Sequence, residues 1–321
     1  MFLIWTGFLT LVLGLLVLDL SVLHRKAHVV AMKEALLMSA FWISLGIAFS
    51  VLVYYGYENQ WLGLGLSIDS VDGTVNNGQS AAIKYITGYV VEKSLSIDNL
   101  FVFLLIFSYF KVPPKYQHKV LFWGIVGALI MRVIFIFAGV ALIEKFHFTI
   151  YIFGALLIYT GYKMFNHNNV KIEPDKNPLI RFFKKFMPVT SHLHEDKFFT
   201  RLDGRRFATP LFLVLILIET TDLIFAVDSI PAILAITQDQ FIVYTSNVFA
   251  ILGLRSLYFA LAGVVHRFWL LSYGLAVVLV FVGIKMLLID LYKIPIEWSL
   301  IFIATIITGS IFLSLKIKRT K

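Results

Sequence analysis

The stretch PLFLVLILIETTDLIFAVDSIPAILAIT, residues 210–237, places three carboxylates inside a run that is otherwise apolar enough for lipid. These carboxylates are Glu219, Asp222 and Asp228. A charged residue at the centre of a membrane helix costs about 2.5–3.5 kcal/mol on insertion scales, so it is kept where something compensates its charge. The stretch therefore indicates a membrane-spanning helix with a polar role in its interior.

The composition of the whole chain agrees with this interpretation. Of 321 residues, 59% are hydrophobic, 16% are aromatic and only 15% are charged, and the mean hydropathy is +0.85. Apolar windows of roughly 20 residues recur along the sequence, which is the length that crosses a hydrocarbon core about 30 Å thick. Barrel strands would alternate apolar and polar residues instead. The sequence therefore predicts an all-α polytopic membrane protein, a single membrane domain over 1–321.

We expect about nine membrane-spanning helices. The first apolar segment lacks the basic region and the small-residue cleavage site of a signal peptide, so we interpret it as a retained helix. The nine expected spans are 2–22, 36–56, 82–109, 119–143, 147–165, 209–235, 241–263, 268–291 and 296–315.

Lys and Arg are distributed unequally between the two sets of loops. Twenty lie on one side, nine of them between Lys171 and Arg206, whereas Lys84, Lys145 and Lys293 lie on the other. The positive-inside rule then predicts an N-terminus outside and a C-terminus in the cytoplasm, which requires an odd number of spans. The net charge of +9 is explained by cytoplasmic loops near anionic lipid, so no nucleic-acid partner is needed.

The one long loop, 166–207, lies on the basic side. Its stretch PLIRFFKKFMP (178–188) interleaves aromatic and basic residues, which suits a short helix at the lipid surface. Asp203-Gly204, between two short runs, predicts a β-hairpin. The loop is either a packed linker between two halves or a segment for gating or for binding a protein partner.

Two parts of the chain resemble each other at a nearly constant offset. Arg132 corresponds to Arg255 at 123 residues, and Asp98 corresponds to Asp222 at 124. We therefore expect a duplicated three-helix unit, with repeat 1 at 82–165 and repeat 2 at 208–291, followed by a last span and basic tail at 292–321. Because three is odd, the second copy crosses the membrane in the opposite sense, as in many transporters whose site lies between inverted repeats. The other matched residues are Gly161, Lys163 and Met164 with Gly283, Lys285 and Met286 at 122, and Glu92 with Glu219 at 127.

The first repeat carries its own polar motif, EKSLSIDNLFVF (92–103). At about 100° per residue, Glu92, Ser96 and Asn99 share a helix face, and Asp98 lies about 120° away. In the second repeat Glu219 and Asp222 share a face, while Asp228 points in the opposite direction. Pro231 denies an amide to the carbonyl of residue 227, so we expect a helix break near 226–230 that turns Asp228 toward the other acids.

These side chains offer carboxylate, amide and hydroxyl oxygens, which suit Mn²⁺, Mg²⁺ or Ca²⁺. The chain has no cysteine, and its eight histidines fall in loops or at span ends, which disfavours zinc and copper. The expected ligands of a transported cation are Glu92, Asp98, Asn99, Glu219, Asp222 and Asp228.

Arg132, Arg255 and Lys93 could instead neutralise some acids in buried ion pairs that only orient helices. Three bases against five carboxylates leave two negative charges, however, which one divalent cation or two protons would balance. We therefore favour an ion pathway, with Lys93, Ser96, Arg132, Arg255 and Pro231 in supporting roles.

At these residues the sequence resembles the TerC family of integral membrane proteins, and its Alx-type members in particular. The resemblance is carried by GYVVEKSLSIDNLFVF, LVLILIETTDLIFAVDSIPAILAIT, SNVFAILGLRSLYF and YGLAVVLVFVGIKML. It implies metal-ion efflux, with manganese foremost, a role in metal or pH stress, and a bacterial inner membrane. The acidic residues of the family motifs correspond to Glu92, Asp98, Glu219, Asp222 and Asp228.

The sequence hypothesis is a secondary transporter that exports Mn²⁺ in exchange for protons and holds no permanently bound cofactor. The alternative is a non-transporting scaffold or assembly and stress-response factor that recruits partners through 166–207. An enzyme is not expected, since the chain has no Walker A or HExxH motif and no cysteine nucleophile.

Overall fold

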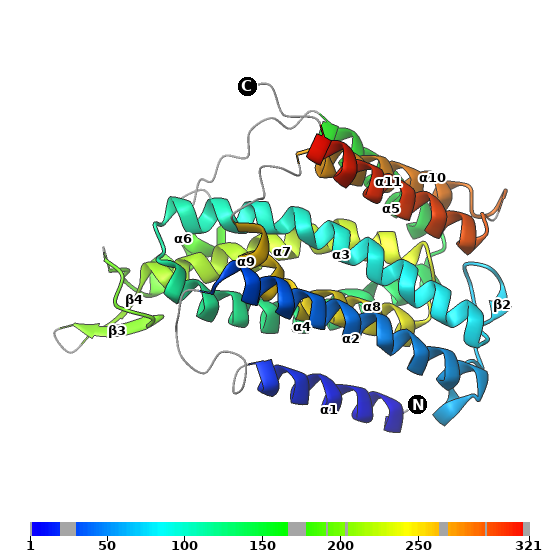
Figure 1. Ribbon diagram of the computed structural model, residues 1–321, viewed down its shortest axis with the longest axis horizontal. Helices are drawn as coiled ribbons and strands as arrows, with labels where there is room; N and C mark the ends of the chain where they lie inside the picture. Colours follow the sequence, from blue (N-terminus) through cyan, green and yellow to red (C-terminus); the bar gives the residue numbers. More distant parts are fainter. Residues whose placement is uncertain are drawn as a thin grey trace.

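The computed structural model describes residues 2–19, 30–165, 178–190, 192–202, 205–262, 269–292 and 294–316. These residues form a bundle in which the axes of the long helices are roughly aligned, while the chain alternates in direction from α2 to α3 to α4 (Figure 1). The helices are α1 (Phe2–Leu18), α2 (Met32–Glu58), α3 (Gly78–Tyr109), α4 (Pro114–Lys145), α5 (Thr149–Phe165), α6 (Pro178–Phe186), α7 (Pro210–Leu234), α8 (Gln240–Leu252), α9 (Leu254–Ala262), α10 (Leu271–Leu287) and α11 (Ile296–Lys316), with a 3₁₀ turn η2 (Trp61–Gly63).

Every expected span is helical over most of its described residues, so the all-α membrane architecture is confirmed. Four described helices, α2, α4, α7 and α11, are long and apolar enough to cross a membrane. The bent pair α8 and α9 would make a fifth, and α1, α5 and α10 are apolar helices of 17 residues each. The 32-residue α3 is long enough to cross but carries the charged residues of the first motif.

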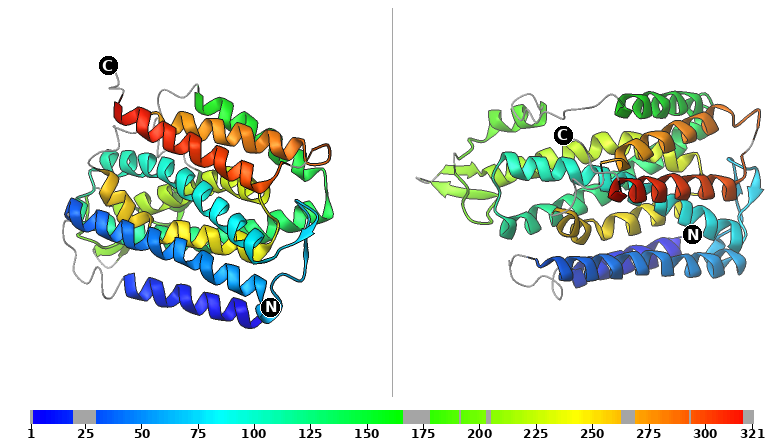
Figure 2. Two further views of the ribbon diagram at one scale, coloured as in Figure 1. Left: turned by 45° about the vertical axis from the view of Figure 1, so that its right-hand side comes forward. Right: turned by 45° about the horizontal axis from the view of Figure 1, so that its top comes forward.

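The helices are arranged in layers. The helices α5, α10 and α11 lie together on one side of the bundle, α1 lies on the opposite side, and α3, α4, α7 and α8 occupy the middle (Figures 1 and 2). Both acidic motifs are therefore in the central layer, on α3 and α7, where neighbouring helices cover them.

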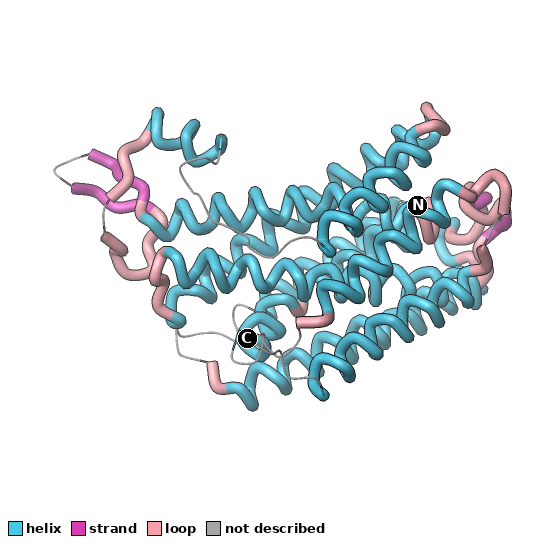
Figure 3. Tube along the Cα trace, turned by 90° about the horizontal axis from the view of Figure 1, so that it is seen from above, coloured by secondary structure: helices cyan, strands magenta, loops and turns pink. Residues whose placement is uncertain are grey.

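Two small sheets mark opposite ends of the bundle (Figure 3). At the end that holds the N-terminus of α1, β1 (Ile68–Asp69) pairs antiparallel with β2 (Thr74–Val75). At the other end, β3 (Phe199–Leu202) pairs antiparallel with β4 (Arg205–Ala208), which confirms the hairpin predicted in the long loop. Its expected turn residues, 203 and 204, lie outside the described residues.

The expected break before Pro231 is wrong. Helix α7 continues from Pro210 to Leu234 with Pro231 inside it. The proline lies three residues before the end of the helix, so its missing amide costs only one hydrogen bond in the final turn. This turn is also held by the Ala235 amide, which donates to the Pro231 carbonyl at 3.0 Å. Asp228 therefore keeps the direction that a regular helix gives it.

An interruption does occur one helix later. The α8 helix ends at Leu252, Gly253 caps it, and α9 starts at Leu254 with a bend of 40°. The helix that the predicted repeat matches with this pair, α4, is continuous over 32 residues. A methyl group on Gly253 would lie 2.7 Å from Cβ of Trp42, so the glycine also permits the close approach of α2.

Helices α5 and α10 pack closely through glycines. A Cβ atom added to Gly283 would lie 2.6 Å from the carbonyl oxygen of Gly154, and one added to Gly161 would lie 2.8 Å from that of Ala276. Small residues let backbones approach in this way, which is how membrane helices commonly associate.

Candidate functional site

The centre of the bundle contains a cluster of buried polar side chains from four helices, which we call the central cluster. Its members are Glu92, Ser96 and Asn99 on α3, Arg132 on α4, Asp222 on α7 and Asn247 on α8, each at most 6% exposed. Ser96 Oγ donates to Glu92 Oε1 at 3.1 Å, which confirms that these residues share one face of α3. Asn99 hydrogen-bonds to Asp222, so the two acidic motifs meet here.

Arg132 is the positive charge of the central cluster. Its Nη1 lies 2.5 Å from Glu92 Oε2 and 2.5 Å from the Asn247 amide oxygen, and Asp222 also attracts it electrostatically. None of the described side chains hydrogen-bonds to the buried Nε of Arg132. A charged group buried this deeply is stable only where opposite charges and hydrogen bonds compensate its lost hydration.

Glu219 lies one helical turn from Asp222 on α7, and the two carboxylates repel each other. The Glu219 carboxylate rests against Gly127 of α4, and a methyl group on Gly127 would overlap it. Because the glycine has no side chain, α4 leaves space for this carboxylate. Glu92, Asp222 and Glu219 together with Arg132 carry a formal charge of two negative.

The remaining expected ligands are placed differently. Asp228 Oδ1 accepts a hydrogen bond from Thr160 Oγ1 of α5 at 2.9 Å, on the face of α7 away from Glu219. Since α7 does not break, the structure does not bring Asp228 into the central cluster. The side chain of Asp98 lies outside the described part of the structure.

Arg255 and Lys93, which the sequence predicted in supporting roles, contact groups outside the central cluster. Arg255 Nη2 lies 2.5 Å from Asp19 Oδ1 and 3.2 Å from the Asp19 carbonyl, so it ties α9 to the end of α1. Lys93 Nζ donates to the carbonyl of Ala250 at 3.0 Å, near the α8–α9 bend. A cation at the carboxyl end of a helix interacts favourably with its unpaired carbonyls.

Within the described ranges, no three His, Asp or Glu side chains lie close enough together to hold a metal ion in this conformation. The donor set of the central cluster is nevertheless made of hard oxygens, from two carboxylates, a hydroxyl and two amides. The guanidinium of Arg132 lies between these donors and holds Glu92.

A second polar network lies at the end of the bundle near β1 and β2, and we call it the end network. Asp69 of β1 is 3% exposed and accepts hydrogen bonds from Lys84 Nζ (2.8 Å), the Gln238 amide (3.1 Å) and Thr237 Oγ1. Burial alone would raise the pKa of Asp69, but the Lys84 ammonium and these hydrogen bonds hold that pKa below its usual value. One loop carboxylate therefore joins α3 to the turn between α7 and α8.

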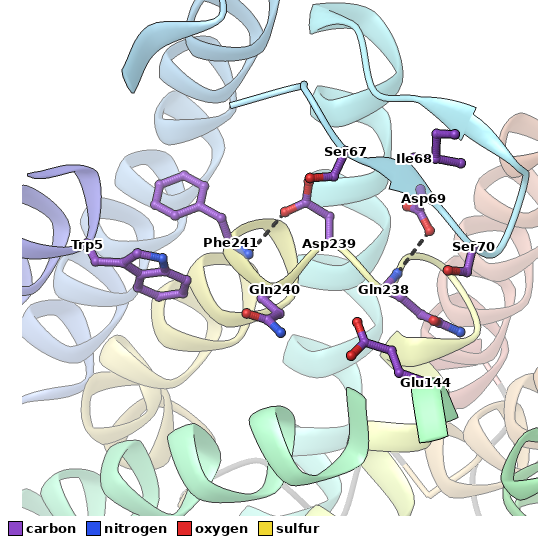
Figure 4. Close-up of a pocket in the computed structure, with 10 residues that line it drawn as sticks. All are labelled: Trp5, Ser67, Ile68, Asp69, Ser70, Glu144, Gln238, Asp239, Gln240 and Phe241. Atoms are coloured by element: carbon purple, nitrogen blue, oxygen red, sulfur yellow. Dashed lines mark hydrogen bonds between the residues drawn. The ribbon is translucent and has the colours of Figure 1, made fainter. Parts of the chain in front are cut away.

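Beside the end network is a pocket of about 230 Å³ (Figure 4). Asp239 caps α8 by accepting from the Phe241 amide at 3.0 Å, and burial raises the pKa of this carboxyl above its usual value. The pocket is lined by Trp5, Ser67, Ile68, Asp69, Ser70, Glu144, Gln238, Asp239, Gln240 and Phe241.

The sequence pattern did not reveal Asn247, Gly127 or the end network. The sequence did contain a signal for Asn247, because it is an amide side chain inside an apolar segment, SNVFAIL. Asp69 and Lys84 gave no such signal, because Asp69 lies in the loop between two expected spans and Lys84 lies near the start of one, and charges are common at both places.

The helices and the buried charges define an integral membrane protein with a polar site in its interior. Residues 77–321 match the family described as Integral membrane protein TerC family. The chain belongs to this family.

Curated relatives match over nearly the whole chain. An uncharacterized membrane protein of Myxococcus xanthus is 48% identical over 312 residues, covering 97% of this chain and 92% of the relative. A protein of Escherichia coli K12 called membrane-bound redox modulator Alx is 47% identical, covering 93% and 89%, and one of the same name from Salmonella typhi is 45% identical, covering 95% and 92%. No solved structure matches the chain.

Proposed function

We propose that this protein is a secondary transporter that exports a hard divalent cation, Mn²⁺ foremost, in exchange for protons. The observation that carries the proposal is the convergence of Glu92 and Asp222, from two separate motifs, inside the helix bundle beside Glu219. Three carboxylates with one guanidinium leave two negative charges. A divalent cation or two protons can balance them, which suits exchange of one for the other.

The proposed transporter has nine spans and an inverted three-helix repeat. The α5–α10 contact supports the repeat, because the offset of 122 relates Gly161 to Gly283 and Gly154 to Ala276. Gly283 meets the carbonyl of Gly154, and Gly161 meets that of Ala276. If each residue of one contact is replaced by its match in the other repeat, the other contact results. A two-fold axis between the two repeats requires this relation.

The proposed orientation puts β3 and β4 in the cytoplasm of a bacterial cell, with the end network outside. The described residues at the β3–β4 end include Lys184, Lys185, Arg201, Arg205 and Arg206, whereas the opposite end is rich in carboxylates, among them Glu58, Asp69, Asp72, Glu144 and Asp290. This asymmetry is the one that the positive-inside rule describes.

Purified protein in liposomes that contain a Mn²⁺-sensitive dye tests the proposal. We expect Mn²⁺ flux under a pH gradient in the wild type, and loss of flux in the double variant Glu219→Gln, Asp222→Asn. Asp290→Asn is the matched control, because this carboxylate is exposed at one end of the bundle. Flux that survives the double variant would defeat the assignment of the site.

A scaffold without transport is the second candidate. Its support is the exposed Phe182, Phe183 and Phe199 beside the basic residues of α6 and the β3–β4 hairpin, where a protein partner could bind. Wild-type protein that reconstitutes well but moves no Mn²⁺ under any pH gradient would favour this candidate.

A further inference from the structure

The contacts of Arg132 are more uneven than a purely structural ion pair requires. One nitrogen, Nη1, makes both short contacts, to Glu92 Oε2 and to the Asn247 amide oxygen, at 2.5 Å each. Its two hydrogens can serve one acceptor each. In the described part of the structure Nε has no hydrogen-bond partner, although Arg132 is only 1% exposed. Buried polar atoms that are left unpaired call for an explanation, and a role in a functional cycle is one.

We propose that the Arg132 guanidinium is a tethered cation that pairs with Glu92 when the transport site is empty and yields this carboxylate to the transported cation. The inference rests on the proposed transport function and adds a resident competitor to its site. It follows from the position of the guanidinium, which contacts Glu92 at the place where a transported cation would need that oxygen.

Asn247 provides the second acceptor that the guanidinium needs when it releases Glu92. The Asn247 Nδ2 group donates to the carbonyl of Val243 at 2.8 Å, which fixes the amide with its oxygen toward Arg132. This oxygen is an uncharged acceptor, so it can keep one hydrogen bond to Nη1 while Glu92 turns to a divalent cation. Arg132 would then move by a change of its own side chain, without a change in α4.

The consequence concerns the return of the carrier without Mn²⁺, when two protons can balance only two of the three carboxylates. An unpaired buried carboxylate is costly to carry through the low-dielectric interior, whereas a paired one is much less so. With Arg132 present, Glu92 has a positive partner in both the empty and the loaded state. Without Arg132, only the loaded protein keeps Glu92 paired, so cation-for-cation exchange would persist while net efflux would fail.

Arg255 is the matched control, because it occupies the equivalent position in the second repeat and is also buried. Its ion pair is with Asp19 of α1 rather than with a carboxylate of the two motifs. Loss of Arg255 can destabilise the protein, but it would change net efflux and exchange in parallel.

The test compares two fluxes in proteoliposomes loaded with radioactive Mn²⁺. Net efflux is measured into buffer without Mn²⁺, and exchange is measured into buffer with unlabelled Mn²⁺. For Arg132→Gln we expect the ratio of net efflux to exchange to fall by about tenfold or more, as an unpaired buried charge predicts. We expect Arg132→Lys, which keeps the charge, to restore much of the ratio, and Arg255→Gln to leave it unchanged. An unchanged ratio in Arg132→Gln would overturn the inference.

Binding of MnCl₂ in detergent, measured by calorimetry, gives a readout that needs no transport. Removal of a competitor tightens binding, so we expect the apparent Kd of Arg132→Gln to fall by about tenfold. Structural damage would weaken binding, and that result would contradict the inference. A wild type that binds Mn²⁺ but moves none would count against the proposed function, and the binding comparison would still decide the role of Arg132.

Arg132→Gln leaves Glu92 unpaired, so the variant could fail to fold. The double variant Glu92→Gln, Arg132→Gln removes both charges and keeps Asp222 and Glu219. Because no Glu92 charge is then left unpaired and the cluster keeps two negative charges, we expect the ratio of net efflux to exchange to return toward the wild-type value. A folded double variant whose ratio falls as far as that of Arg132→Gln would overturn the inference.

Discussion

At the scale of single residues, the acids of the two motifs differ in what compensates them. Glu92 has the guanidinium of Arg132, Asp222 has the amide of Asn99, and Asp228 has the hydroxyl of Thr160. Glu219 rests against a glycine instead. Asp222 and Asp228, which are only six residues apart on α7, therefore belong to different surroundings.

This difference predicts unequal effects of two similar substitutions. Asp222→Asn removes a charge from the central cluster, whereas Asp228→Asn keeps a hydrogen-bonding group next to Thr160 on another face of α7. We expect Asp222→Asn to lower the Mn²⁺ flux by about a hundredfold, and Asp228→Asn by only a few fold. Initial rates in proteoliposomes check this, and equal losses in the two variants would show that Asp228 shares the transport site.

Gly127 gives a prediction that changes no charge. Gly127→Ala would place a methyl group where the Glu219 carboxylate lies, so we expect a clear loss of Mn²⁺ flux with the fold retained. Gly309→Ala is the control, because a methyl group there meets nothing within 4 Å. Thermal unfolding of both variants in detergent separates loss of function from loss of stability. Normal flux in Gly127→Ala would mean that Glu219 can act from another position.

The sequence predicted the types and the helix faces of these residues but not their partners. The period of a helix places Glu92 and Ser96 together because they lie on one element. The pairing of Arg132 with Glu92 and Asn247, or of Arg255 with Asp19, depends on how separate helices are packed. Nothing in the spacing along one helix encodes this.

At the scale of elements, apolar length identified the helices well because lipid permits few other structures. The position of the interruption was harder to foresee. Proline is a strong local signal, yet Pro231 lies so close to the end of α7 that the helix tolerates it. The observed bend falls at Gly253, which α2 approaches closely, and this tertiary contact leaves no trace in local sequence.

The end network predicts a large stability effect from a single substitution at an element boundary. Lys84→Met would leave Asp69 buried beside Thr237 without its cation. We expect the free energy of unfolding to fall by about 3–5 kcal/mol, the usual cost of breaking a buried ion pair by removing one partner. Denaturant unfolding of the detergent-solubilised protein measures this. A loss below about 1 kcal/mol, the range of exposed pairs, would show that the pair is solvated.

The same network has a defined dependence on pH. The pKa of Asp69 is lowered in the folded protein from 3.8, so its contribution to stability is present above that value and is lost as pH falls through the folded pKa. Asp239, whose pKa is raised, changes stability in the opposite sense. We therefore expect Asp69→Asn to be less stable than the wild type near neutral pH, with the difference shrinking below about pH 4. Thermal unfolding followed by tryptophan fluorescence checks this, and a gap that widens in acid would contradict it.

At the scale of the whole molecule, the two ends of the bundle differ in charge, and this predicts its orientation. The chain has no cysteine, so single cysteines can be introduced without removing native ones. Asp290→Cys and Asp196→Cys lie at opposite ends, and the side chains they replace are 51% and 52% exposed. In intact bacterial cells an impermeant maleimide should label residue 290 and spare residue 196. Labelling of residue 196 alone would invert the proposed topology.

The contact between α5 and α10 has a consequence for any movement of the molecule. Gly154 and Gly283 bring two backbones to a separation that no larger residue permits, and Gly161 does the same against Ala276. Both ends of the contact line are thereby held at one distance, so α5 and α10 can tilt about this line but cannot part along it. In the proposed transporter, where these helices belong to opposite halves, we expect an opening at one end of the bundle to be coupled to closure at the other.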